Sequence, residues 1–264
     1  YFNIEVDDAI RTFGVDAVLN NCVTNASATF TPESCALINR DAAGSLWLTP
    51  NGFTVDLPNN VGRLQTSGIE VAGRYSAPVS FGTISFSMNG TYLDSYEVEN
   101  GLTNADGSQV SYDCAGLYGP TCSVGGTSDA GAPLPRWRHK ARVSLNTDSG
   151  IGGSIQWRHV GKVTAETVSS FAALNPGGLT DHAGPGTRIP SFNYIDAVLS
   201  FDLQETFQFR LGVNNLFDKE PPLVTSGGGG TPNLCPTGPC NGNTYPATWD
   251  ALGRYFFAGV TLDF

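Results

Sequence analysis

The sequence predicts an all-β fold, a transmembrane antiparallel β-barrel, from three observations. Eight segments carry apolar side chains at every second residue, which is the period of a β-strand. The connections between these segments are alternately short and long. The faces opposite the apolar ones carry charged side chains, which suit a wet lumen but would be very costly in the dry core of a sandwich.

Each segment has the alternation expected of a strand that crosses a membrane. In the last segment, "RYFFAGVTLDF", the apolar set is Phe256, Ala258, Val260, Leu262 and Phe264. In the fourth segment, Arg138, Lys140 and Arg142 share the polar face. The eight segments in chain order are Phe2–Ile10, Leu64–Ala77, Thr83–Glu97, Arg136–Asn146, Ile151–Val163, Ser191–Leu203, Thr206–Phe217 and Arg254–Phe264.

The connections differ in length according to their place in the order. Those after the second, fourth and sixth segments are short: "PVSFG", "DSG" and "QET". The long ones cover Arg11–Arg63, Val98–Pro135, Thr164–Pro190 and Asp218–Gly253. Outer-membrane barrels have short periplasmic turns and longer extracellular loops. The pattern therefore predicts a bacterial outer-membrane protein whose long loops are extracellular.

Composition agrees with a β protein that has polar loops. Charged residues make up 14% of the 264 residues, whereas about 25% is usual in soluble domains. The net charge of -10 argues against a general affinity for nucleic acid. The sequence has no apolar run of about 18 residues, so it predicts no transmembrane helix.

The six cysteines all fall in predicted outer loops, two in each of three loops. An even number of cysteines, paired locally outside the cytosol, indicates disulfides. Zinc binding is the alternative, but His139, His159 and His182 are not near these pairs and no CxxC spacing occurs. The expected disulfides are Cys22–Cys35, Cys114–Cys122 and Cys235–Cys240.

Several stretches resemble a known family. "FQFRLGVNNLFDKEPP" (Phe207–Pro222) resembles the penultimate strand of TonB-dependent outer-membrane receptors, and "RYFFAGVTLDF" resembles their last strand with its terminal aromatic residue. "LQTSGIEVAGRY" and "YFNIEVDDAI" also resemble strands of that barrel. The family has an N-terminal plug and a barrel of about 22 strands. The resemblance implies that residues 1–264, which show neither plug nor TonB box, form the C-terminal eight strands of such a barrel.

The resemblance also implies a function and partners. A receptor of this family takes up a scarce nutrient, drawing on the TonB energy-coupling protein, and needs no cofactor. The expected partners are the N-terminal plug-and-barrel part of the receptor, TonB, outer-membrane lipid and the nutrient. A last strand of this kind resembles the signal that the outer-membrane assembly machinery reads, here Phe256, Val260, Leu262 and Phe264.

Three interpretations of the function stay open. The long, disulfide-pinned loops favour a saccharide, peptide or other organic ligand. A siderophore-iron receptor of the same family is one alternative. The other is a free-standing eight-stranded barrel with a structural or adhesive role, whose lumen is filled by side chains.

Two groups of residues are candidates for ligand contact. Outer-loop aromatic residues can stack on a sugar ring or on a siderophore aromatic ring, or can simply pack the loops. They are Trp47, Phe53, Tyr112, Tyr118, Phe171, Tyr245 and Trp249. The basic residues expected to face the lumen can attract an anion, or can pair with acids of the plug or with Glu70, Asp196 and Asp202. They are Arg138, Lys140, Arg142, Arg158 and Arg210.

The remaining features predict neither an enzyme nor a metal site. No GxSxG motif occurs, and His139 and His159 fall on the predicted lipid face with the interfacial Trp137 and Trp157. The loop acids lack the spacing of a calcium-binding loop. These acids are Asp41, Asp106, Asp113, Asp129, Glu166 and Asp181.

Overall fold

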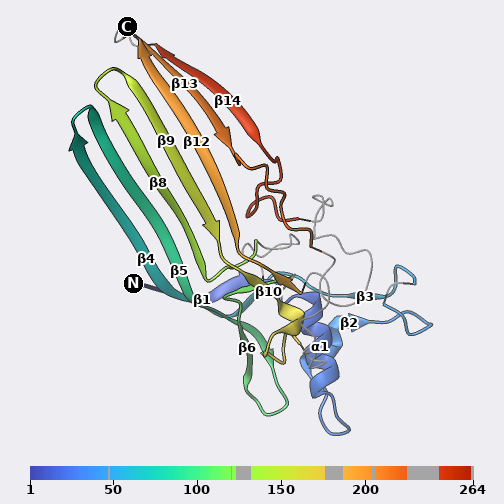
Figure 1. Ribbon diagram of the computed structural model, residues 1–264. Coiled ribbons are helices and arrows are strands. Elements are labelled where there is room, and N and C mark those ends of the chain that lie inside the picture. Colours follow the sequence, from blue (N-terminus) through green and yellow to red (C-terminus); the bar gives the residue numbers. More distant parts are fainter. Residues whose placement is uncertain are drawn as a thin grey trace.

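Figure 1 shows a computed structural model of the 264-residue chain. The structure describes residues 1–46, 48–119, 121–122, 132–175, 187–203, 206–224 and 244–262. The residues of the sequence predictions that lie outside the described ranges are Trp47, Asp129, Asp181, His182, Cys235, Cys240 and Phe264.

A single long antiparallel sheet dominates the structure (Figure 1). Its path is β1-β4-β5-β8-β9-β12-β13-β14, so the eight strands follow one another in chain order, and β6 pairs in addition with β5. These eight strands are the eight predicted segments. Their bounds are β1 Phe2–Arg11, β4 Asn59–Val79, β5 Gly82–Thr103, β8 Trp137–Thr147, β9 Ile151–Val160, β12 Phe192–Leu203, β13 Phe207–Asn214 and β14 Tyr255–Leu262.

The short turns and the long connections lie at opposite ends of the sheet (Figure 1). The β4–β5 hairpin closes with Val79 opposite Gly82, which leaves a two-residue turn. The β8–β9 turn contains Gly150 at φ 79, a conformation that glycine adopts without steric cost. The lopsided arrangement of connections is therefore as the sequence predicts.

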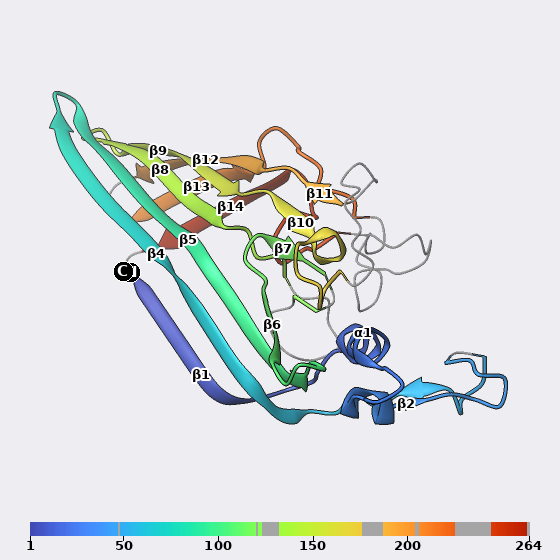
Figure 2. The ribbon, with the colours of Figure 1, turned by 90° about the horizontal axis from the view of Figure 1, so that it is seen from below.

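Strands β4 and β5 are longer than the sequence suggested. They contain 21 and 22 residues, whereas about 9–11 tilted residues cross a bilayer. The extra length continues the sheet among the loop elements, where β5 also pairs with β6, Gln109–Asp113 (Figure 2). Conversely, the segment predicted as Ile151–Val163 ends at Val160, and residue 163 begins the separate strand β10.

The long connections contain short ordered elements that the sequence did not predict. Strands β11, β10 and β7 form a small sheet, and β2 pairs with β3. These strands have two or three residues each, which is too short for a period of two to be recognised. The elements are α1 Val15–Asn25, η1 Glu33–Leu37, β2 Ile38–Asn39, β3 Phe53–Thr54, β7 Leu117–Tyr118, β10 Val163–Ala165, η2 Glu166–Val168 and β11 Arg188–Ile189.

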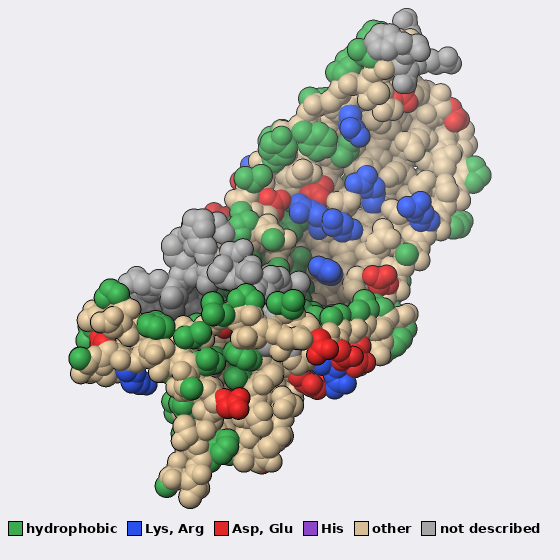
Figure 3. Space-filling model, turned by 180° about the vertical axis from the view of Figure 1, so that it is seen from behind, with side chains coloured by type: hydrophobic (Ala, Val, Ile, Leu, Met, Phe, Trp, Pro, Cys, Tyr) green, Lys and Arg blue, Asp and Glu red, His purple; other side chains and the backbone are tan. Residues whose placement is uncertain are grey.

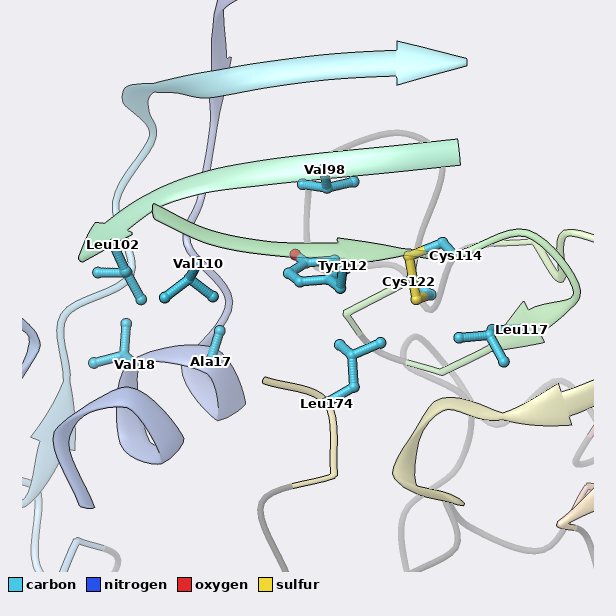
Figure 4. Packing of buried hydrophobic residues seen from close by; sticks show 10 residues of the cluster. All are labelled: Ala17, Val18, Val98, Leu102, Val110, Tyr112, Cys114, Leu117, Cys122 and Leu174. Atoms are coloured by element: carbon cyan, nitrogen blue, oxygen red, sulfur yellow. A yellow bond between two sulfur atoms is a disulfide. The ribbon is translucent and has the colours of Figure 1, made fainter. Parts of the chain in front are cut away.

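The buried hydrophobic residues lie mainly in the loop region, in two clusters. In the first, residues of α1 face residues of β5 and β6 (Figure 4). The second gathers Tyr118, Val163, Tyr194 and Trp249 with their neighbours. The loop region is thus a packed cap with hydrophobic cores of its own. Burial of the apolar side chains in these cores stabilises the irregular backbone of the cap.

Two of the three expected disulfides are present in the described residues. Cys22–Cys35 joins α1 to η1. Cys114–Cys122 lies in the first loop cluster, where both sulfur atoms are buried. Each bond joins two cysteines of one connection, in agreement with the local pairing read from the sequence.

One face of the long sheet is apolar and open to the surroundings. Residues directly opposite each other in antiparallel strands share a face. One row across the sheet runs Phe86, Val143, Ile155, Ala197, Val213, Phe256. Val143, Ile155 and Phe256 are 51%, 59% and 71% exposed, as suits side chains that face lipid. Among the described residues, no helix is long and apolar enough to span a membrane.

Candidate functional site

The opposite face of the sheet collects the predicted basic residues. Lys140 lies opposite Asn89 on one side and Arg158 on the other. Arg142 lies opposite Ser87 and Gln156, and Arg210 lies opposite Ser200. Figure 3 shows Lys and Arg side chains gathered over this part of the sheet. We call this surface the polar face.

A cavity of about 950 Å³ opens where the polar face meets the cap. Strands β4, β5, β8, β9 and β12 form one wall, and residues 246–252, just before β14, form another. We call it the basic cavity. Its charged, titratable and aromatic lining residues are Glu70, Arg138, His139, Lys140, Arg158, His159, Tyr194, Trp249 and Asp250.

Arg158 is held in place by two carboxylates. Its Nε donates to Oδ2 of Asp196 at 2.7 Å, and its Nη2 donates to Oδ1 of the same residue at 2.8 Å. Nη2 also reaches Oδ2 of Asp250 at 3.1 Å. The guanidinium lies 5.0 Å from the centroid of the Tyr194 ring, so a cation–π contact adds to the paired hydrogen bonds.

Arg138 and Lys140 differ from Arg158 in their partners. In the described part of the chain, neither forms an ion pair. Glu70, Asp196 and Asp202 are the neighbouring acids that the sequence predicts as possible partners of the basic residues. Of these three, Asp196 does so, whereas Asp202 accepts a hydrogen bond from Gln208. Two cations of the basic cavity are therefore available to an anion.

The described aromatic candidates lie mostly in the cap. Tyr112, Tyr118, Tyr245 and Trp249 are all buried, at 4%, 1%, 7% and 1% exposure. Tyr118 and Tyr245 meet edge to face with ring centroids 6.0 Å apart. Burial raises the pKa of Tyr118 to about 12 and raises that of Tyr245 as well. This is the packing role offered as the alternative to ligand contact.

Three aromatic candidates also border cavities. Trp249 lines the basic cavity. Tyr112 and Phe171 line a second cavity of about 430 Å³, whose charged residues are Arg63, Glu97, Glu99 and Asp113. Phe53, in contrast, is 48% exposed on β3.

The "NNLFDK" stretch forms the end of β13. The Asn215 side chain accepts from the Lys219 N–H at 2.8 Å and donates to the Lys219 carbonyl at 2.9 Å. Asp218 accepts from the Arg254 N–H at 2.7 Å. Asn215 and Asp218 both have positive φ, 52 and 54. These bonds to the backbone fix the strand end beside β14, and the Asn215 N–H in turn donates to Asp196.

One part of the site could not be predicted from the sequence. Asp250 lies in the long connection before β14, and its ion pair with Arg158 spans 92 positions. A carboxylate in a polar loop has no periodicity that would point to a partner so distant along the chain. Tyr194, by contrast, falls on the polar face by strand alternation alone. The described residues contain no group of three or more His, Cys, Asp or Glu that could hold a metal ion.

The fold and the site define a class: a segment of an antiparallel barrel sheet with exposed apolar side chains on one face and a charged, capped cavity on the other. Residues 1–216 match the sequence family described as "TonB dependent receptor-like, beta-barrel". The chain belongs to this family of outer-membrane proteins, which are transporters and not enzymes. No curated protein matches the sequence at a significant level.

Two solved structures share the fold at low identity, and a third is similar with a lower score. A point mutant of the ferric enterobactin receptor PfeA from Pseudomonas aeruginosa is 15% identical, with a TM-score of 0.53 over 100% of this chain and 28% of that one. A double mutant of PfeA is 15% identical, with a TM-score of 0.52 over 99% of this chain and 28% of that one. The siderophore receptor PirA from Acinetobacter baumannii is 14% identical, covering 100% of this chain and 29% of that one, with a TM-score of 0.49. The chain thus spans 28% of the length of the PfeA structures.

Proposed function

We propose that this chain is the C-terminal part of a TonB-dependent receptor in a bacterial outer membrane, with the cap facing outward. The family match and the exposed apolar face support this assignment. Strands β1 and β14 each pair with one neighbour among the described residues. Each edge therefore offers unpaired backbone groups to further strands, which a membrane barrel must satisfy.

The other partners follow from the same proposal. The N-terminal plug-and-barrel part supplies the remaining strands and the plug, and TonB supplies the energy. Outer-membrane lipid covers the apolar face. Basic residues deeper on the polar face, such as Arg142 and Arg210, lie where acidic groups of a plug could meet them.

We infer that the ligand is an anionic siderophore-iron complex. The observation that carries this inference is the pair Arg138 and Lys140, which line the basic cavity without an acidic partner among the described residues. The solved structures with the same fold include receptors named for ferric enterobactin. This support exceeds that for the saccharide, peptide or other organic nutrient that the loop composition suggested. A free-standing eight-stranded barrel is supported least, since β1 and β14 are at opposite edges of the sheet's path.

Binding measurements on the whole receptor test the ligand class. The variant is Arg138→Gln/Lys140→Gln, the control is Lys162→Gln at an exposed position outside the cavity, and the probe is a ferric triscatecholate complex. We expect the double variant to weaken binding about tenfold or more and to flatten its dependence on salt, because two charge-assisted contacts are lost. The control should bind like the parent.

Two outcomes would contradict the proposal. Equal binding by the double variant and the parent would show that these cations do not hold the complex. Failure of the parent to bind any anionic iron complex, with binding of a neutral saccharide or peptide instead, would restore the nutrient interpretation.

A further inference from the structure

A third cavity lies at the surface of the cap between α1 and β6, where Thr24, Gln109 and Ser111 of its lining are exposed. Its volume is about 380 Å³. One helix face supplies Ala17, Asn20, Asn21, Thr24 and Asn25, at the spacing of successive helical turns. The opposite wall comes from residues 104 and 108–111, and Ala172 and Ala173 complete it. We call it the amide cavity.

The described lining of the amide cavity is polar but uncharged. It contains four asparagines, a glutamine, two serines and a threonine, together with alanines and one valine. Among the residues that the structure describes, no acidic or basic side chain lines it. A charged ligand would find no counter-charge among these residues, so the cavity suits a neutral ligand.

Part of the lining is locked into a fixed frame. Ser34 Oγ donates to Oδ1 of Asn21 at 2.6 Å, and Nδ2 of Asn21 donates to the Thr103 carbonyl at 3.2 Å. Asn25 receives a hydrogen bond from the Ala105 N–H at 2.9 Å. The Cys22–Cys35 disulfide ties the same helix to η1. Contacts inside the first cluster also hold the helix against β6 (Figure 4), so the cavity walls are held in place before any ligand binds.

Other groups of the lining are free. In the described part of the chain, the side chains of Asn20, Thr24 and Ser111 make no hydrogen bond. The Asn20 amide can donate two hydrogen bonds and can accept through its oxygen. The Thr24 and Ser111 hydroxyls can each donate or accept. Ala17, Ala172 and Ala173 leave small apolar surfaces beside them. A ligand that fits must present many hydroxyl groups and some C–H surface.

We propose that the amide cavity binds a neutral carbohydrate. Sugar hydroxyls match the free amide and hydroxyls, and the C–H face of a sugar ring matches the alanines. Its volume falls in the range of about 300–1,000 Å³ that is usual for small-molecule sites. The carbohydrate is either a free saccharide or the sugar part of a surface glycolipid. This site is separate from the basic cavity and does not depend on the siderophore proposal.

The test uses the intact receptor in lipid nanodiscs and an array of neutral and acidic glycans. The variant is Asn20→Ala/Thr24→Ala, and Ser111→Trp fills the cavity by an independent route. The control is Asn60→Ala, an exposed asparagine of β4 outside the cavity. We expect neutral glycans to bind the parent and the control, with a loss of about tenfold or more in both cavity variants.

The outcomes separate the possibilities. Binding of free neutral oligosaccharides that the cavity variants lose supports a saccharide site. Binding seen only when the sugar is presented on a glycolipid, and lost in the same variants, supports a lipid-borne sugar. No neutral glycan bound in either form, or binding that both cavity variants retain, would overturn the proposal. Ferric-complex binding should be the same in the parent and in these variants, so failure here is distinct from failure of the proposed function.

Discussion

The indole Nε1 of Trp137 donates a hydrogen bond to Nδ1 of His139 at 2.8 Å. Because that nitrogen accepts, the neutral imidazole carries its proton on Nε2. His139 meets the Trp157 ring edge to face, with centroids 4.3 Å apart and planes at 89°. His159 stacks on His139 at 5.1 Å, so the four rings form one cluster on the apolar face.

Gly90 makes the room for this cluster. A Cβ atom added there would lie 2.7 Å from Cη2 of Trp137 and 3.1 Å from Cβ of His139. We expect Gly90→Ala to displace the indole, break its hydrogen bond and destabilise the barrel by about 1–3 kcal/mol. The unfolding temperature of the receptor, followed by its shift in gel mobility after heating, measures this effect.

Gly73 provides the matched control. It lies on β4 of the same sheet, and an added Cβ would have nothing within 4 Å. Gly73→Ala should leave the unfolding temperature unchanged. If both substitutions lowered the unfolding temperature equally, the loss of glycine's backbone freedom, and not displacement of the indole, would explain the destabilisation.

Asp196 organises the basic cavity. Its carboxylate accepts from Arg158, from Gln156 and from the Asn215 N–H. Asp196→Ala should lower the free energy of unfolding by about 1–3 kcal/mol, because it leaves a half-buried guanidinium with one partner and a backbone donor with none. Denaturant titration of the receptor measures the change, and Asp148→Ala in the exposed β8–β9 turn should have little effect. A large loss in the turn variant would point to general fragility and not to this network.

Tyr118 makes the cap sensitive to alkaline pH. Its hydroxyl is buried without a partner among the described residues, and its pKa is raised from 10.0 to about 12. The unfolded phenol loses its proton first, so the stabilisation by the neutral form is full below pH 10 and is lost as pH rises towards 12. Limited proteolysis of the cap across this range should show increasing cleavage.

The variant Tyr118→Phe separates this residue from its neighbour Tyr245. Removal of an unpaired buried hydroxyl should leave the stability equal or raise it by about 1 kcal/mol. The loss of cap stability at alkaline pH should become smaller but should persist, since the pKa of Tyr245 is also raised. A marked loss of stability at neutral pH would show that the Tyr118 hydroxyl has a partner in solution.

The disulfide between α1 and η1 should stabilise the cap and not the sheet. The two cysteines are 13 positions apart, for which the loop-entropy relation gives about 3 kcal/mol. Cys22→Ser/Cys35→Ser should therefore expose residues of α1 to protease while the unfolding temperature of the barrel stays the same. A parallel fall in barrel stability would show that cap and sheet unfold as one unit.

The long sheet could be predicted from the sequence because apolar side chains on the lipid face alternate with polar side chains on the water face of each strand. The row from Phe86 to Phe256 follows from alternation alone. The cap could not be predicted, because its strands are short and its packing brings together connections that are far apart along the chain. Tyr112 and Trp249 illustrate the difficulty: an aromatic residue in a polar loop looks the same whether it contacts a ligand or fills a core. Arg158 was assigned to the polar face, and Asp196 among its possible partners, but Asp250 was found only in the fold.

The alternating directions of the eight strands impose a rule of parity on the complete barrel. β1 runs towards the cap and β14 runs away from it, so the two edges of the sheet already point in opposite senses. An unbroken antiparallel ring can be completed only by strands added in pairs. An odd number would force one parallel seam, whose slanted hydrogen bonds differ from those of every other junction. Counting the strands of the assembled receptor would thus also show whether the ring contains such a seam.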